Sequence, residues 1–331
     1  MQIQIMLILG VIIALTGSLI LGIMSWRGRR LVASTPVTQT DAPDDLSPAL
    51  SGMLLAVNPM PGWKQVLATL FDLANRGMLS FTEITSPNPR DEKHFIIKKR
   101  ASTSPLSGHE EGLLQTLFPT EETELPFTQL SKAYKRNTTP FTEPLKQELG
   151  KRSFLDPQRQ RLRQRFSTIS LILFLFSLLG IIASLFIGTT STAWLIVFPA
   201  LGLLSVCMVA FFLMTYYSPL SERGTQAARA SWSFSEHLLN IASKSSHTPS
   251  SPDLFEHYLP FATSYGLLKP WIRYFRKQAP DHIPSWFETT STTPAQSFIA
   301  FTAITLAAYT TGNTSSGPSP LSSPTTPNKT K

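Results

Sequence analysis

Two apolar stretches with a short link between them decide the fold of this chain: ISLILFLFSLLGIIASLFI at residues 169–187 and AWLIVFPALGLLSVCMVAFFLMTY at residues 193–216. Each approaches or exceeds the roughly 20 residues that a helix needs to cross the hydrocarbon core of a bilayer. Neither stretch contains a charged residue or a histidine. The uncharged link GTTST at 188–192 is typical of a tight connection between two antiparallel helices. The pattern therefore predicts a transmembrane helical hairpin over residues 169–216.

A third apolar run lies at the N-terminus, from Ile5 to Met24, and it is again uncharged and long enough to span a bilayer. No positive residue precedes the run, and three follow it: Arg27, Arg29 and Arg30. A secretory signal has the opposite order, with positive charge before the apolar region and a small-residue cleavage site after it. We therefore expect residues 1–26 to be a retained anchor whose N-terminus lies outside.

Positive charge is concentrated beside the predicted spans, and the chain as a whole has a net charge of +8. Lys and Arg collect on the cytoplasmic side of membrane helices, so the arms at 27–30 and 151–165 are expected to be inside. This predicts a multi-pass protein of the cell membrane with its soluble modules in the cytoplasm. We assign seven arginines to topology or to contact with lipid headgroups: Arg27, Arg29, Arg30, Arg159, Arg161, Arg163 and Arg165.

Small residues recur at helical spacing in the first two spans. They are Gly10, Ala14, Ser18 and Gly22 in the first span and Ser177, Gly180 and Ser184 in the second. Such a stripe lets two helix backbones approach closely. We predict that these two spans pack against each other; the alternatives are a homodimer seam or a docking face for another membrane protein. Because the spans carry no Asp, Glu, Lys, Arg or His, a self-contained pore or pump is not expected.

The soluble residues predict several small modules. A basic arm and linker at 27–46 leads to a module at 47–100, in which a short helix near Pro48 and a helix over Trp63–Arg76 precede two strands, MLSFTEI and HFIIKKR. A helix followed by a hairpin is winged-helix-like. The capping box SGHE at 107–110 opens a second, mostly helical module at 101–156, and a basic juxtamembrane arm at 157–168 follows it.

Beyond the hairpin, residues 217–300 predict a third cytoplasmic module with an amphipathic helix and a segment dense in aromatic residues. We expect this segment to pack on the other modules, the alternative being the membrane surface. Four of its residues are interpreted as an interaction surface: His257, Tyr258, Trp271 and Tyr274. Residues 301–331 are expected to be a disordered tail rich in Ser, Thr and Pro. The predicted fold class is an α-helical membrane protein with three transmembrane helices and small α+β, winged-helix-like cytoplasmic modules.

Residues that carry the common chemistries are scarce or scattered. Cys207 is the only cysteine and lies in an apolar run, which excludes an internal disulfide framework and a cysteine-based zinc site. The six histidines show no i,i+3 or i,i+4 pairing, and there is no P-loop, GxGxxG or GxSxG motif. We therefore predict no catalytic residues, no metal ligands and no cofactor.

Five segments support a family resemblance: LSPALSGML at 46–54, VLATLFDLANRGMLSF at 66–81, EEGLLQTLF at 110–118, LSERGTQAARASWSFSEHLL at 220–239 and FEHYLPFATSYGLLKPWIRYF at 255–275. In this order they resemble the YciQ-like predicted bacterial membrane proteins, a family of unknown function. The resemblance implies a membrane protein and supplies no catalytic residues. Family members often carry an extracytoplasmic β-sandwich before the anchor and a glycine-rich tail; this chain resembles a version that lacks both.

These observations favour a non-enzymatic, membrane-anchored scaffold or adaptor that binds another membrane or cytoplasmic protein and that could also form homo-oligomers. One alternative is a membrane-tethered winged-helix nucleic-acid binder. Nucleic acid is the less favoured partner because acidic residues are interspersed with Lys98, Lys99 and Arg100 and no Arg, Asn or Gln cluster suits the reading of base edges. The other alternative is an accessory subunit of a transporter or of an envelope enzyme complex.

Overall fold

The structure, a computed structural model, describes residues 2–28, 41–43, 46–56, 59–84, 94–101, 104–119, 122–187, 193–216, 218–243 and 252–313. The chain divides into two compact units, each built from segments far apart in the sequence. The first comprises Met1–Thr35 and Ser153–Gly224, and the second comprises Pro36–Arg152 and Thr225–Lys331.

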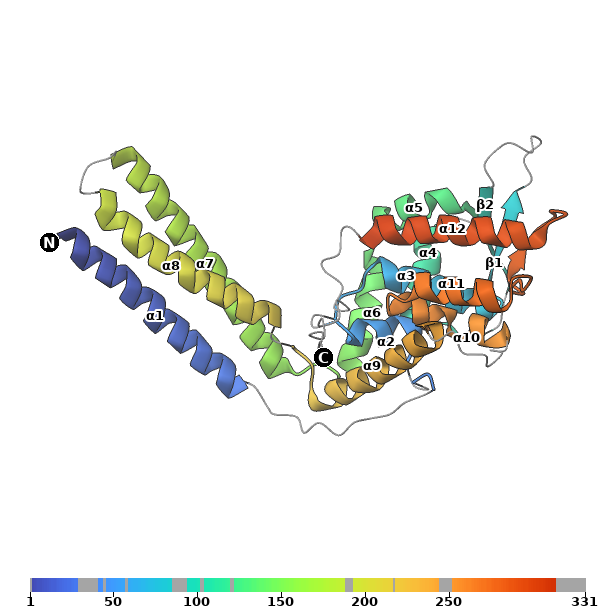
Figure 1. The fold of residues 1–331 in the computed structure, drawn as a ribbon, viewed down its shortest axis with the longest axis horizontal. Coiled ribbons are helices and arrows are strands. Elements are labelled where there is room, and N and C mark those ends of the chain that lie inside the picture. Colours follow the sequence, from blue (N-terminus) through green and yellow to red (C-terminus); the bar gives the residue numbers. More distant parts are fainter. Residues whose placement is uncertain are drawn as a thin grey trace, which may run out of the picture. The chain divides into compact units, whose positions relative to one another are not determined.

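The first unit contains three helices that are long and apolar enough to cross a membrane. They are α1 (Gln2–Gly28), α7 (Pro157–Ile187) and α8 (Ala193–Tyr216) (Figure 1). Helix α8 packs against both α7 and α1. Large apolar side chains such as Leu15, Leu185 and Phe186 are exposed on these helices, as expected for surfaces that face lipid rather than water. The three predicted spans are confirmed as helices of suitable length and composition.

The predicted basic arm at 157–168 is the first part of α7, because the helix begins at Pro157 and runs on into the apolar span. A short antiparallel bridge joins the residues just before α7 to those just after α8. The amide of Asp156 donates to the carbonyl of Pro219 at 2.9 Å, and the amide of Ser221 donates to the carbonyl of Phe154 at 2.8 Å. The chain entering α7 is thereby fixed to the chain leaving α8.

The second unit is largely helical and contains one four-stranded sheet of order β3-β2-β1-β4. Its helices are α2 (Pro48–Leu54), α3 (Trp63–Asn75), α4 (Gly108–Leu117), α5 (Leu130–Arg136), α6 (Thr139–Lys151), α9 (Glu222–Ser243), α10 (Pro252–Ser264), α11 (Leu268–Gln278) and α12 (Pro294–Asn313), with a 3-10 turn, η1, at Phe127–Gln129. Its strands are β1 (Leu79–Ile84), β2 (His94–Lys99), β3 (Glu124–Pro126) and β4 (Phe287–Glu288). Strands β1 and β4 are parallel, and the other pairs are antiparallel.

The sheet has one apolar face and one polar face, as the period of two in a strand dictates. Phe81, Phe95 and Phe287 lie on the apolar face, where the ring of Phe301 from α12 contacts all three at centroid distances of 5.0 to 5.4 Å. On the other face Lys98 of β2 pairs with Glu124 of β3 at 3.1 Å. Helix α12 therefore closes the hydrophobic core over the sheet.

The local elements predicted for residues 47–156 are confirmed, but the expected division into separate modules is wrong. Strand β3, from the predicted second module, extends the hairpin of the first, and β4, from the predicted third, pairs with β1. Helix α10 packs on both α2 and α3. The helix and hairpin of the winged-helix-like pattern are therefore parts of one larger unit, because their apolar faces are buried by elements that follow more than 150 residues later.

The predicted tail also needs correction. Residues 301–313 belong to α12, in which Phe298, Phe301, Thr305 and Tyr309 are buried. Their spacing of three or four residues places them on one helical face. The helix was assigned to the tail because its apolar run is too short to span a bilayer and is followed by residues of a different composition. The remainder of the predicted tail, residues 314–331, lies outside the described residues.

Candidate functional site

Two open hollows flank the exposed side chain of His257 on the surface of the second unit. The first, of about 620 Å³, is lined by Asn75, Asp253, Leu254, Glu256, His257, Tyr258 and Ser285. The second, of about 380 Å³, is lined on one side by Ala42, Pro43, Leu46, Ser47 and Pro48, and on the other by Asp72, Arg76, Glu110, His257 and Phe261. Helix α10 contributes to both, and His257 lines each of them.

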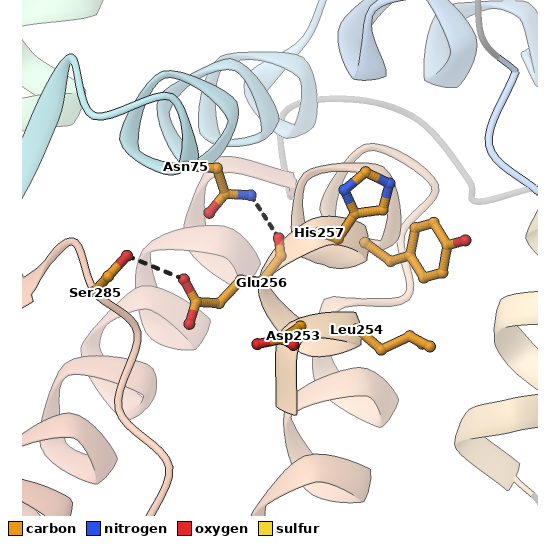
Figure 2. A pocket seen from close by; sticks show the side chains of 7 residues that line it. Asn75, Asp253, Leu254, Glu256, His257 and Ser285 are labelled. Atoms are coloured by element: carbon orange, nitrogen blue, oxygen red, sulfur yellow. Dashed lines mark hydrogen bonds between the residues drawn. The ribbon is translucent and has the colours of Figure 1, made fainter. Parts of the chain in front are cut away.

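Glu256 is the polar centre of the first hollow. Asn75 donates to its main-chain carbonyl at 2.5 Å, and the Ser285 hydroxyl donates to its carboxylate Oε2 at 3.4 Å (Figure 2). His282 Nε2 lies 3.1 Å from the other carboxylate oxygen. The Asn75 side chain is itself held by Trp286, whose Nε1 donates to Asn75 Oδ1 at 2.8 Å. These contacts bind the end of α3, the start of α10 and the chain before β4 to one another.

The order of these groups does not suit nucleophilic catalysis. In a Ser-His-acid triad the imidazole stands between the hydroxyl and the carboxylate, so that it can take the hydroxyl proton. Here the carboxylate of Glu256 stands between Ser285 and His282. The exposed ring of His257 has no hydrogen bond to any described residue and stacks edge-on with Tyr258 at 4.9 Å. The arrangement ties the segments together and leaves the imidazole of His257 exposed beside them.

The second hollow is bordered by an ion-pair group on the guanidinium of Arg76. Its Nη2 lies 3.1 Å from Asp72 and 2.5 Å from Glu110. Burial raises the pKa of Asp72, and the positive charge of Arg76 opposes that rise. Glu110 also accepts from the amide of Ser107 at 2.8 Å, as the capping box predicts. Because the carboxylates of Asp72 and Glu110 are both paired with Arg76, they hold this side of the hollow in place and are not free to act as an acid or a base.

A buried histidine lies in the first turn of α4, where His109 is 1% exposed. Its Nδ1 is 3.3 Å from Glu148 of α6 and 3.1 Å from the hydroxyl of Ser107. The hydrogen bond with His109 holds the pKa of Glu148 below its usual range, although partial burial opposes this. Arg152 adds a second contact to Glu148 at 2.9 Å. The pair joins α4 to α6 from inside the unit and is closed to substrates. Among the described residues no group of three or more His, Cys, Asp or Glu side chains could hold a metal ion.

The structure separates the four residues of the predicted interaction surface. His257 is exposed and Tyr258 is half-buried, and both line the first hollow. Trp271 is completely buried and Tyr274 is 6% exposed, so assigning these two to a surface was wrong. Their rings, with that of Phe275, form the apolar side of α11, whose opposite side carries the helix's basic residues. Glu256, Asn75 and Ser285 were missed, since no local spacing connects positions so far apart.

The basic residues considered for nucleic acid are largely committed to the protein itself. Lys98 pairs with Glu124 and Arg100 pairs with Glu288, which also accepts a hydrogen bond from Thr82 at 2.7 Å. The bond from Thr82 and the charge of Arg100 hold the pKa of Glu288 below its usual range, although burial opposes them. No observation on this face favours binding of phosphates.

The small-residue stripe of the first span is used within the chain, but not as predicted. Helix α1 packs along α8 rather than along α7. A Cβ added at Gly10 would lie 2.5 Å from the carbonyl of Phe198, and one added at Gly202 would lie 2.5 Å from the carbonyl of Gly10. Close backbone approach therefore occurs at this crossing. The α8-facing residues of α1 also include Gly17, which the stripe omitted, whereas Gly22 has open space around its Cα.

The second-span residues lie against α8. The Ser177 hydroxyl donates to the carbonyl of Ala200 at 2.9 Å, and a Cβ on Gly180 would contact Ala200 at 3.1 Å. Ser184 bonds within its own helix, to the carbonyl of Ile181. Ala14 and Ser18 are half-buried on α1. Helix α8, the third span, therefore packs against both other spans. Its sequence has no stripe of small residues that would predict this arrangement.

The basic residues near the membrane have mixed roles. Arg159 donates from Nη1 to the carbonyl of Leu220 at 2.9 Å and lies 3.7 Å from Asp156, so it also fixes the base of the hairpin. Arg161 and Arg165 are exposed and Arg163 is half-buried. Arg27 lies in the last turn of α1, and its side chain, like Arg29 and Arg30, falls outside the described residues.

Three apolar helices of membrane-spanning length, joined in one chain to a second, largely helical unit with a small sheet, define an integral membrane protein. Residues 35–275 match the family described as "Predicted membrane protein (DUF2207) C-terminal domain". The match covers well over half of the chain, so the protein belongs to this family, in agreement with its resemblance to the YciQ-like proteins. No curated protein matches the chain, and neither does any solved structure.

Proposed function

We propose that this protein is a non-enzymatic, membrane-anchored scaffold or adaptor that binds another protein through the surface around His257. The observation that carries the proposal is the state of this surface. Glu110 and Glu256 are held by Arg76, His282 and Ser285, whereas the side chain of His257 is exposed and lines both open hollows. A rigid, shallow surface of mixed polar and apolar lining with an accessible ring suits contact with a protein better than it suits enclosure of a small substrate.

The rigidity of this surface has a physical source. Behind α10, the hydroxyl of Ser51 lies 2.8 Å from that of Ser231 and 2.5 Å from that of Tyr265, and all three side chains are buried. Burial raises the pKa of Tyr265, so the phenol stays neutral at physiological pH. The network joins α2, α9 and the chain after α10, so a partner would meet a preformed surface and lose little binding free energy to ordering it.

The orientation proposed with this function places the N-terminus of α1 outside and the second unit in the cytoplasm of a cell. The arginines that follow α1 and begin α7 support it, because positive residues are retained on the cytoplasmic side. The test uses a His257→Cys variant in a Cys207→Ala background, in which the introduced thiol is the sole cysteine. A membrane-impermeant maleimide should label inverted vesicles and leave intact cells unlabelled. Labelling of intact cells would refute the orientation.

Binding of a protein partner is tested by site-specific photo-crosslinking in the full-length chain. A photoreactive residue is placed at His257 and, as the control, at Lys277, which is exposed on α11. We expect a discrete adduct from position 257 and none from position 277. The captured protein is then purified and titrated against the wild type and against Tyr258→Ala, for which we expect at least tenfold weaker binding. Equal capture at both positions, or unchanged affinity in the variant, would contradict the proposal.

A further inference from the structure

A third hollow is lined largely by side chains of α5, and none of its residues lines either hollow beside His257. The helix follows the 3-10 turn η1 directly, and one side of it is packed into the core: Leu130, Ala133 and Tyr134 are buried. The other side contributes Ser131, Lys132, Lys135 and Arg136 to the lining of a hollow of about 450 Å³, to which η1 adds Thr128. The spacing of the four α5 residues places them on one helical face.

The packed side holds this face in place. The Tyr134 ring lies 5.8 Å from the ring of Trp63 and 6.0 Å from that of Phe141, so α5 is fixed to α3 and α6. Burial raises the pKa of Tyr134 to about 12, which keeps its phenol neutral. The cationic face is therefore presented by a short helix whose orientation is set by aromatic contacts rather than by its own charges.

The charges on this face are uncompensated. None of the residues that line the hollow is acidic. Within the described part of the chain Lys132, Lys135 and Arg136 form no ion pair, whereas Lys98 and Lys146 have Glu124 and Glu143 as partners. Like charges three and four residues apart on a helix repel one another and cost stability. An anion in the hollow would relieve this repulsion.

We propose that this hollow binds the phosphate group of a phosphorylated ligand, either a soluble molecule or the headgroup of a lipid. Two ammonium groups and a guanidinium supply charged donors, and Thr128 and Ser131 supply hydroxyl donors, which together suit the oxygens of a phosphate. The hollow is open to solvent, and its volume exceeds that of a phosphate, so the remainder of the ligand has room to extend from the site. Binding at this hollow does not depend on the proposed adaptor role.

The experiment compares two variants that lose the same charge from exposed helical faces. In one, Lys132, Lys135 and Arg136 are all changed to Gln; in the matched control, Lys269, Lys277 and Arg273 of α11 are changed to Gln. Full-length protein in phosphatidylcholine nanodiscs is titrated with inorganic pyrophosphate at low salt. The same protein is tested for capture by vesicles of phosphatidylcholine with phosphatidic acid. Thermal unfolding without ligand verifies that both variants fold.

We expect the α5 variant to lose at least tenfold in affinity for one of these probes, while the α11 variant keeps the wild-type affinity. Binding of pyrophosphate would identify a soluble ligand as the source of the phosphate, and binding confined to the vesicles would identify a lipid headgroup. Equal losses in the two variants would show that only overall charge matters and would overturn the proposal. Failure of the wild type to bind either probe would also overturn it.

Discussion

Replacing Gly52 by Ala tests the packing of α2 on α10, which joins the two chain segments of the second unit. Gly52 lies in α2, near the start of that unit, and faces Ser264 at the end of α10. A Cβ at this position would lie 1.8 Å from the Ser264 hydroxyl oxygen, 2.7 Å from its Cβ and 2.9 Å from its carbonyl oxygen. The hydroxyl can rotate away, but the other two atoms move only if α2 and α10 separate.

The magnitude follows from two opposing effects. Overpacking of a closely packed core costs about 1–3 kcal/mol, whereas replacing Gly by Ala within a helix gains up to about 1 kcal/mol. The neighbouring Ser51 holds the hydroxyls of Ser231 and Tyr265, so a displacement of α2 also strains these bonds. We expect a net loss of about 1–2 kcal/mol, which for a domain of this size lowers the unfolding midpoint by roughly 2–8 °C.

The assay is thermal unfolding of the full-length protein in detergent, followed by tryptophan fluorescence. The control is Gly150→Ala in α6, where an added Cβ meets nothing within 4 Å; this change should raise the midpoint, because only the helical preference of alanine acts. Adding Ser264→Gly to Gly52→Ala should recover part of the loss by removing the two closest atoms. If Gly52→Ala were as stable as Gly150→Ala, the packing of α2 on α10 would be refuted.

Three further perturbations test other joints. Gly10→Leu should destabilise the membrane unit in detergent because it forces α1 from α8, whereas Gly22→Leu, at a site with open space, should leave the unit unchanged; equal effects would exclude the observed crossing. Ser51→Ala should cost about 1–2 kcal/mol in chemical unfolding because it leaves buried hydroxyls short of partners, and a neutral result would contradict the network. Glu148→Gln should lower stability by about 1 kcal/mol at pH 6. Because the folded-state pKa of Glu148 is lowered, this difference should vanish as the pH falls below about 4.5; a difference that grows with acidity would refute the contact with His109.

Local structure was predictable where short-range rules determine it. The apolar spacing in Trp63–Asn75 identified that helix, and Gly77, with φ of 75°, ends it in the left-handed conformation expected after a helix. The capping box at Ser107 opens α4 as predicted. These features depend on residues within a few positions of one another, so one segment of sequence contains all the information they need.

Long-range pairing was not predictable in the same way. Strand β4 has two residues and pairs with β1 through Phe81 and Phe287, about 200 positions apart. No alternation can be recognised in two residues, so its place in the sheet depends on the whole unit folding. The choice of α8 as the neighbour of α1 is similar. Gly202 provides the closest approach, but a lone glycine in an apolar span has no distinctive spacing.

The outcome for the aromatic segment bears directly on function. Trp271 and Tyr274 were expected to belong to an interaction surface. Together with Phe275 they are core residues, because α11 places these rings opposite its Lys and Arg side chains. The many aromatic residues of this segment therefore indicate a contribution to the hydrophobic core. The three buried rings of α11 are not available to a partner or to lipid. The accessible groups include the imidazole of His257 on one surface, the cationic side of α5 on another, and a few exposed apolar side chains such as Trp232 and Leu239 of α9. Recognition at the cationic side of α5 should consequently depend on charge, and binding there should weaken as ionic strength rises.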